Sequence, residues 1–158
     1  MDTCKAPITR LLIDTFGEDH RRIHHALDVL KHAERIAETA GNCDAEVLIA
    51  SALLHDIGFK QSEAELGCND GHTREKVGPP VAEKPLAGIG FPPKKTKKVC
   101  EIIGSHHSPS RYDYAEPAVL MQADAAVNRN EGGRPAGRER RILCPAHARG
   151  KQTPEEPS

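Results

Sequence analysis

The chain has 158 residues, enough for one domain that buries a single hydrophobic core. Aromatic residues make up only 3% and Trp is absent, which argues against a β-sandwich and against an aromatic platform for nucleic-acid bases. A formal net charge of -1 makes no strong case for nucleic-acid binding, and the absence of a membrane-length apolar run or a signal peptide predicts a cytoplasmic protein that does not bind membranes.

Helical periodicity marks the first part of the chain. An amphipathic segment covers residues 8–16, and a second helix is predicted over 19–40. A third helix is predicted over 44–57, and it is apolar on nearly every face, so we expect it at the centre of the fold. Asp residues at the start of the second and third segments suit N-caps, and the Gly residues after them suit helix stops.

The middle of the chain has weaker signals. Residues 60–71 are predicted as a looser region with one helical turn at 62–66, and three prolines interrupt a less secure helix over 73–87. Further helices are predicted over 93–106 and 116–128, and no strand pattern of useful length is present. The fold class expected is therefore an all-α, single-domain helical bundle of about five to seven helices.

The C-terminal segment differs from the rest in composition. Residues 129–158 are rich in Gly, Pro and basic side chains and carry little apolar surface. Such a segment gains little by packing, so we expect a helical domain over residues 1–128 followed by a poorly packed or flexible tail. A solvated terminus is the preferred interpretation over a basic arm that binds nucleic acid.

Several polar side chains fall where the predicted helices should be buried. His55 and Asp56 form a doublet at the end of the most apolar helix, and His25, His106 and Asp124 lie on the apolar stripes of their own helices. A single buried histidine is more often an ordinary core residue, but burying all of these is costly without a ligand. A divalent metal would balance that cost, and imidazole with carboxylate suits Fe, Mn, Zn, Co or Ni.

These residues give the chain a resemblance to the HD-domain superfamily, which is named for its His-Asp doublet. The family pattern of His, His-Asp and a distal Asp matches His25 in HHALDVLKHAERIA, His55 and Asp56 in ALLHDIG, and Asp124 in LMQADAAVN. The likeness covers roughly residues 18–128 and is of the HDIG type. It implies an all-α bundle with a metal site, which usually serves phosphoester hydrolysis.

The sequence also resembles the two-metal branch of that superfamily. The branch adds a His ahead of a helix of small residues, which His72 fits, and a His at the end of the next helix, which His106 fits with His107 beside it. The resemblance therefore implies one or two divalent transition-metal ions. A solvated loop histidine is the alternative interpretation of His72.

The implied function is that of a metal-dependent phosphohydrolase that cleaves a nucleotide or other small phosphoester with a metal-activated water. Asp56 and Lys60 are the candidate catalytic residues, and Arg111 is a candidate for binding the substrate, with an ordinary surface arginine as its alternative. Two other functions stay open: a di-iron HD-type oxygenase of a small polyol or phosphonate, and a non-catalytic sensor of metal or nucleotide. The partner expected is a small phosphorylated substrate, and a homodimer is also left open.

Overall fold

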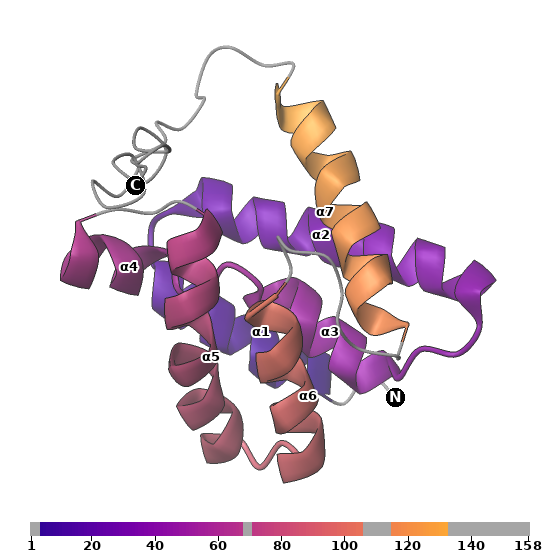
Figure 1. Cartoon of the computed structure of the whole chain (residues 1–158), viewed down its shortest axis with the longest axis horizontal. Coiled ribbons are helices and arrows are strands. Elements are labelled where there is room, and N and C mark those ends of the chain that lie inside the picture. The colour runs from indigo at the N-terminus through magenta and orange to yellow at the C-terminus, as the bar shows by residue number, and fades with distance from the viewer. Residues whose placement is uncertain (1–3, 68–70, 106–114, 133–158) are drawn as a thin grey trace, which may run out of the picture.

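The structure is a computed structural model that describes residues 4–67, 71–105 and 115–132. Within these ranges the chain forms helices and no strands, which confirms the expected all-α class (Figure 1). The helices in chain order are α1 (Lys5–Phe16), α2 (His20–Ala40), α3 (Ala45–Leu54), α4 (Phe59–Leu66), α5 (Gly71–Gly88), α6 (Pro93–Ile103) and α7 (Glu116–Gly132).

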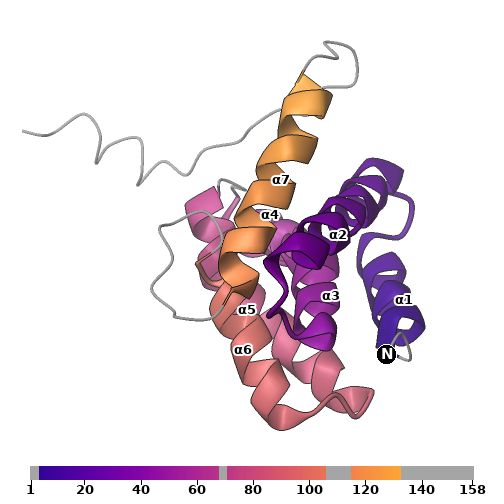
Figure 2. The same ribbon diagram turned by 90° about the vertical axis from the view of Figure 1, so that its right-hand side faces the viewer.

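Helix α3 forms the centre of the fold, as its apolar sequence predicts. Every side chain from Val47 to Leu54 is buried. Helices α1, α2, α6 and α7 all contact α3, and Figures 1 and 2 show α7 lying across α2 while α5 and α6 pack as a pair. The ends of α3 and the inner faces of α2 and α7 are therefore held close together by the core.

Local capping residues set the bounds of the central helices. The side chain of Asp19 accepts a backbone hydrogen bond from the first turn of α2, and Gly41 ends that helix with a φ of 83°. The side chain of Asp44 accepts hydrogen bonds from the backbone N–H groups of Glu46 and Val47, at 3.0 and 3.2 Å. These contacts satisfy N–H groups that have no partner within the helix, so α2 and α3 begin at the predicted places.

Two predicted elements differ in length from the observed ones. Helix α3 ends at Leu54, and a turn over residues 55–58 follows it and carries the His-Asp doublet. Much of the segment 60–71, which was expected to be loose apart from one turn at 62–66, belongs to α4. This helix begins at Phe59, whose ring is buried in the core. Anchoring of that ring explains why a regular helix follows the turn so directly.

Helix α5 is continuous from Gly71 to Gly88, whereas its prolines led us to expect interruptions. Packing against α6 compensates for the lost backbone hydrogen bonds. The Cys100 thiol, whose pKa is raised to about 11 by burial and by nearby glutamates, stays protonated and donates to the Pro79 carbonyl at 3.5 Å. Gly78 also permits close approach, because a Cβ there would lie 2.7 Å from Ile103 Cγ2.

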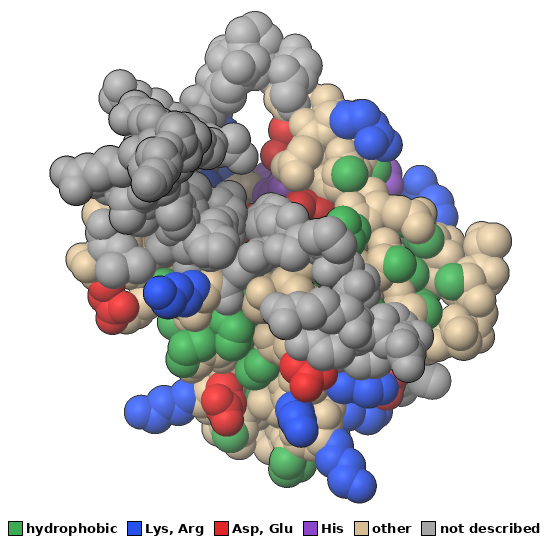
Figure 3. All heavy atoms as spheres, viewed as in Figure 1, with side chains coloured by type: hydrophobic (Ala, Val, Ile, Leu, Met, Phe, Trp, Pro, Cys, Tyr) green, Lys and Arg blue, Asp and Glu red, His purple; other side chains and the backbone are tan. Residues whose placement is uncertain are grey.

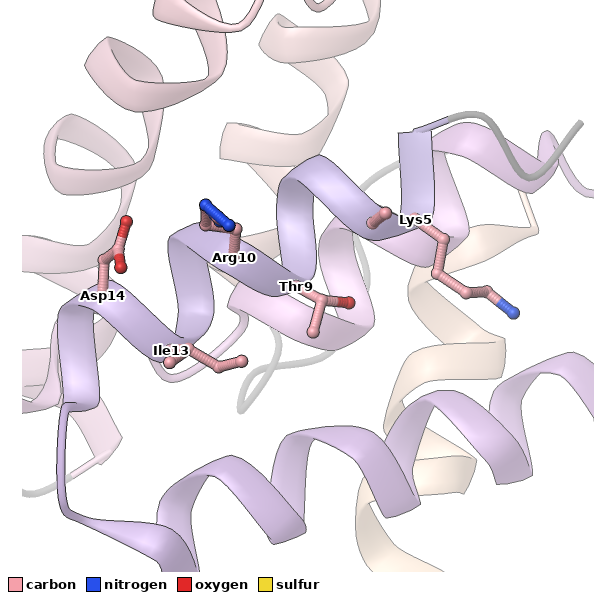
Figure 4. A pocket seen from close by; sticks show the side chains of 6 residues that line it. Lys5, Thr9, Arg10, Ile13 and Asp14 are labelled. Atoms are coloured by element: carbon pink, nitrogen blue, oxygen red, sulfur yellow. The ribbon is translucent and has the colours of Figure 1, made fainter.

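Helix α1 carries a pocket whose described lining residues all belong to this helix (Figure 4). Its walls combine charged and aliphatic side chains, including Lys5, Arg10, Ile13 and Asp14. None of the described His and Asp residues that the sequence places inward, namely His25, His55, Asp56 and Asp124, lines it. In the described part of the chain, no helix is both long enough and apolar enough to cross a membrane.

Candidate metal centre

Three separate segments of the fold bring four of the predicted site residues together. His25 lies on α2, His55 and Asp56 lie in the turn after α3, and Asp124 lies on α7. All four side chains are buried, and His55 has no exposed surface at all. We call these four residues the His-Asp cluster.

The Nε2 atoms of the two imidazoles in the His-Asp cluster lie close to both carboxylates. Oδ1 of Asp124 lies 3.1 Å from Nε2 of His25 and 3.4 Å from Nε2 of His55. Oδ2 of Asp56 lies 3.4 Å from Nε2 of His55 and 3.8 Å from Nε2 of His25. Potential ligand atoms of His25, His55 and Asp56 all lie within 4.8 Å of one another, which is close enough for one ion to reach them.

The protonation of the cluster shows how strongly it attracts positive charge. Burial lowers the pKa of His55, but the carboxylates of Asp56 and Asp124 outweigh burial and raise it to about 9. Burial raises the pKa of Asp124, but His55 and His25 outweigh burial and hold it well below its usual value. Without a metal, therefore, protons on the imidazoles balance the buried carboxylates, and a divalent cation can take their place.

The donor set itself fits a divalent metal ion. Two imidazole nitrogens and two carboxylate groups provide the mixture of nitrogen and oxygen ligands that first-row transition metals accept. In the part of the chain that the structure describes, no other group of three or more His, Cys, Asp or Glu side chains is placed to hold an ion. Figure 3 shows histidine and acidic side chains close together in a recess beside α7.

Arg22 lies beside the cluster and was not singled out from the sequence. A guanidinium nitrogen lies 3.7 Å from Oδ2 of Asp56, and the guanidinium carbon lies 3.3 Å from the centre of the Phe59 ring. The aromatic face holds the cation near the carboxylate. Its spacing was a usable signal, because a residue three positions before His25 lies on the same helix face.

Glu131 is a second neighbour that the sequence interpretation missed. Its Oε2 lies 3.0 Å from Nδ1 of His25, on the opposite side of the ring from Asp124. Residue 131 was assigned to the expected tail, but α7 continues to Gly132. The signal was its spacing of seven residues from Asp124, which places both residues on one face of a helix.

The described part of the structure does not include the side chains of the remaining predicted site residues. His106, His107 and Arg111 lie outside the described residues. His72 and Lys60 belong to the backbones of α5 and α4, but the structure does not describe their side chains. Helix α6 ends at Ile103 with Gly104 as its C-cap, so it is shorter than the helix predicted over 93–106.

Comparison with known proteins agrees with the geometry. Residues 22–146 match the HD domain family, and this range includes the whole His-Asp cluster. Ribonuclease Y from Thermus thermophilus is 29% identical over 129 residues, which cover 78% of this chain and 20% of that protein. The chain thus spans about a fifth of the length of this relative. No solved structure matches the chain. Since the family match covers most of the sequence and the buried cluster is present, the chain belongs to the HD-domain superfamily of metal-dependent phosphohydrolases.

Proposed function

We propose that this chain hydrolyses a nucleotide or another small phosphoester with the help of at least one divalent transition-metal ion. The observation that carries the proposal is the convergence of two buried imidazoles and two buried carboxylates from α2, the end of α3 and α7. Burying such groups is costly unless they bind an ion.

Each member of the cluster has a role in this proposal. His25, His55, Asp56 and Asp124 hold the ion. When bound, the ion lowers the pKa of a coordinated water and polarises a phosphoryl oxygen of the substrate. The carboxylate of Asp56 also orients the attacking water, and this makes Asp56 the candidate catalytic residue.

Arg22 supplies a cation close to the reacting centre in this proposal. Its planar guanidinium can donate two parallel hydrogen bonds to a phosphate group. The 3.7 Å approach to Asp56 and the stacking on Phe59 support this role, because they hold the guanidinium beside the place where a phosphate would meet the ion. Lys60 and Arg111 are proposed as further anion-binding groups on the basis of the sequence alone.

We also propose a second ion, as the HDIG-type, two-metal branch would have. Asp56 would bridge the two ions, and His72 with His106 and His107 would complete the second site. The support for this proposal is the order of these residues in the sequence. Counting the ions in protein purified without chelator tests it, because one ion per chain would exclude the two-metal arrangement.

An RNA phosphodiester is a second candidate substrate. The specific observation that favours it is the 29% identity with ribonuclease Y. Against it stands the net charge of -1, which offers little attraction for a long polyanion. A short single-stranded RNA oligonucleotide therefore belongs in the substrate panel next to nucleotides.

The test is release of phosphate or nucleotide from a phosphoester panel, with Mn²⁺, Fe²⁺, Co²⁺, Ni²⁺ or Zn²⁺ supplied and oxygen excluded. Turnover by the wild-type chain, and none by Asp56→Asn, would support hydrolysis. Turnover that needs oxygen and iron would instead point to the oxygenase. Tight binding of metal or nucleotide without turnover of any substrate would point to the sensor.

A further inference from the structure

The two imidazoles of the His-Asp cluster are held in different ways at Nδ1, on the side of each ring that faces away from the carboxylates of Asp56 and Asp124. Nδ1 of His55 lies 2.8 Å from the backbone carbonyl oxygen of Ala52, one turn earlier in α3. Nδ1 of His25 instead lies 3.0 Å from the carboxylate of Glu131. The orientation of the first ring is therefore set by its own helix, whereas that of the second depends on a side chain from α7.

Glu131 is placed to orient His25 and is not placed to bind the same ion. Its carboxylate meets Nδ1, while Nε2 of the same ring points to Asp124 and Asp56. An ion bound at Nε2 would lie on the opposite side of the ring from Glu131. A carboxylate that accepts the Nδ1 hydrogen fixes the tautomer, so that the lone pair of Nε2 is presented to a metal.

The exposure of Glu131 separates this contact from ordinary core packing. Its side chain is 46% exposed, whereas that of His25 is 11% exposed. Glu131 lies at the end of α7, two turns beyond Asp124, so one helix supplies both a group for the ion and a group for the back of the neighbouring imidazole. Because removing an exposed carboxylate leaves no buried cavity, the contact can be tested without unfolding the protein.

We propose that Glu131 is a positioning residue that holds the Nδ1 hydrogen of His25 and thereby aims Nε2 at the metal ion. The proposal rests on the proposed function insofar as an ion binds the His-Asp cluster. It goes further by assigning a role to a residue at the C-terminal end of α7. Glu131 acts through His25 and touches neither the ion nor the substrate.

The first test is Zn²⁺ affinity, measured by competition with a chromophoric chelator. We expect Glu131→Ala to weaken Zn²⁺ binding by about 10- to 100-fold, the range found when a partner of a metal-binding histidine is removed. Glu131→Gln should lose less, because its amide oxygen still accepts the Nδ1 hydrogen. Glu38→Gln is the charge control, since Glu38 is exposed near the far end of α2 and should bind Zn²⁺ like the wild type.

The second test needs no metal. In the metal-free protein at mildly acidic pH, imidazole protons that are hydrogen-bonded at Nδ1 should give low-field NMR signals protected from exchange. We expect Glu131→Ala to lose the His25 signal and to keep the His55 signal, which reports the bond to Ala52 and acts as an internal reference. A residue that only stabilised the end of α7 would leave both signals in place.

The outcomes separate this proposal from the proposed function. If Glu131→Ala binds Zn²⁺ as tightly as Glu38→Gln, or keeps a protected His25 Nδ1 proton, Glu131 does not position the ring. If His55→Ala binds Zn²⁺ as tightly as the wild type, the cluster is not the metal site and the proposed function fails. In that case the Nδ1 signal of His25 alone decides whether Glu131 holds the ring.

Discussion

The α2–α3–α7 part of the molecule and the α5–α6 pair follow from the sequence in different ways. Helices α2 and α3 begin at Asp caps. Their apolar residues predict that the His and Asp side chains among and after them are buried, and these side chains form part of the His-Asp cluster. Helix α5 contains three prolines and persists because it packs against α6. Local signals therefore locate the cluster, whereas tertiary contacts determine the helix that runs beside it.

The largest effect should come from breaking the cluster itself. Asp124→Asn removes the charge that faces both imidazoles, so we expect loss of metal binding and a decrease of about 3 kcal/mol in the free energy of unfolding of the metal-free protein. Metal analysis and denaturant unfolding measure the two effects. Asp28→Asn, an exposed site on α2, is the matched control. Equal metal content in the two variants would contradict the account.

The pH dependence of stability should also be governed by the cluster. The pKa of His55 is raised from 6.5 to about 9, so its contribution is fully present below pH 6.5 and is lost as pH rises through 9. The pKa of Asp124 is lowered, so its contribution is lost as pH falls below about 4. We expect chelator-treated protein to be most stable between about pH 4 and about pH 6.5. Its free energy of unfolding should then fall by on the order of 3 kcal/mol as the pH rises through 9.

Urea unfolding at a series of pH values measures this profile. Asp124→Asn should flatten its alkaline limb, because the carboxylate that raises the pKa of His55 is gone. A wild-type free energy of unfolding that stays constant from pH 6.5 to 9 would show that the imidazoles are not protonated in the folded protein.

A smaller effect is expected where α5 meets α6. Gly78→Ala places a Cβ 2.7 Å from Ile103 Cγ2, so the Ile103 side chain or its helix must shift, at a cost of about 1 to 3 kcal/mol in the free energy of unfolding. Gly88→Ala is the matched control at the end of the same helix, because nothing lies within 4 Å of the added atom. Equal thermal unfolding of the two variants would mean that the close contact does not support α5.

The smallest effect is expected at the start of α3. Asp44→Ala removes the acceptor for two backbone N–H groups and should lower the free energy of unfolding by about 1 kcal/mol. Asp44→Ser should restore most of that loss, because its hydroxyl can cap the same groups. If the serine variant is as unstable as the alanine variant, the ion pair of Asp44 with Lys95, at 3.3 Å, matters more than the cap.

Much of the fold and the core of the site could be predicted because they depend on local patterns. His55 comes directly after a helix that is apolar on nearly every face, and Asp124 lies on the apolar stripe of its own helix. The sequence therefore predicted that both side chains point inward, and both are buried. The two neighbours Arg22 and Glu131 share helix faces with His25 and Asp124, but this spacing alone did not show that they contact the cluster. Their importance comes from contacts across helices, and Glu131 lies beyond the predicted end of α7.

Other predictions depended on helix lengths that local propensity does not fix. The helix predicted over 93–106 ends at Ile103 in the structure, where Gly104 forms its C-cap. The continuity of α5 depends on contacts such as Cys100 with Pro79, which join residues far apart in sequence. The division into a domain over 1–128 and a tail over 129–158 stays a prediction, although α7 already continues to Gly132.

The most direct test of the central claim is an anomalous difference map from crystals soaked in Mn²⁺. We predict a peak within bonding distance of Nε2 of His25 and of His55 and of the carboxylates of Asp56 and Asp124. A second peak nearby would be compatible with this account. Manganese bound elsewhere on the chain, with no peak at these four side chains, would contradict it.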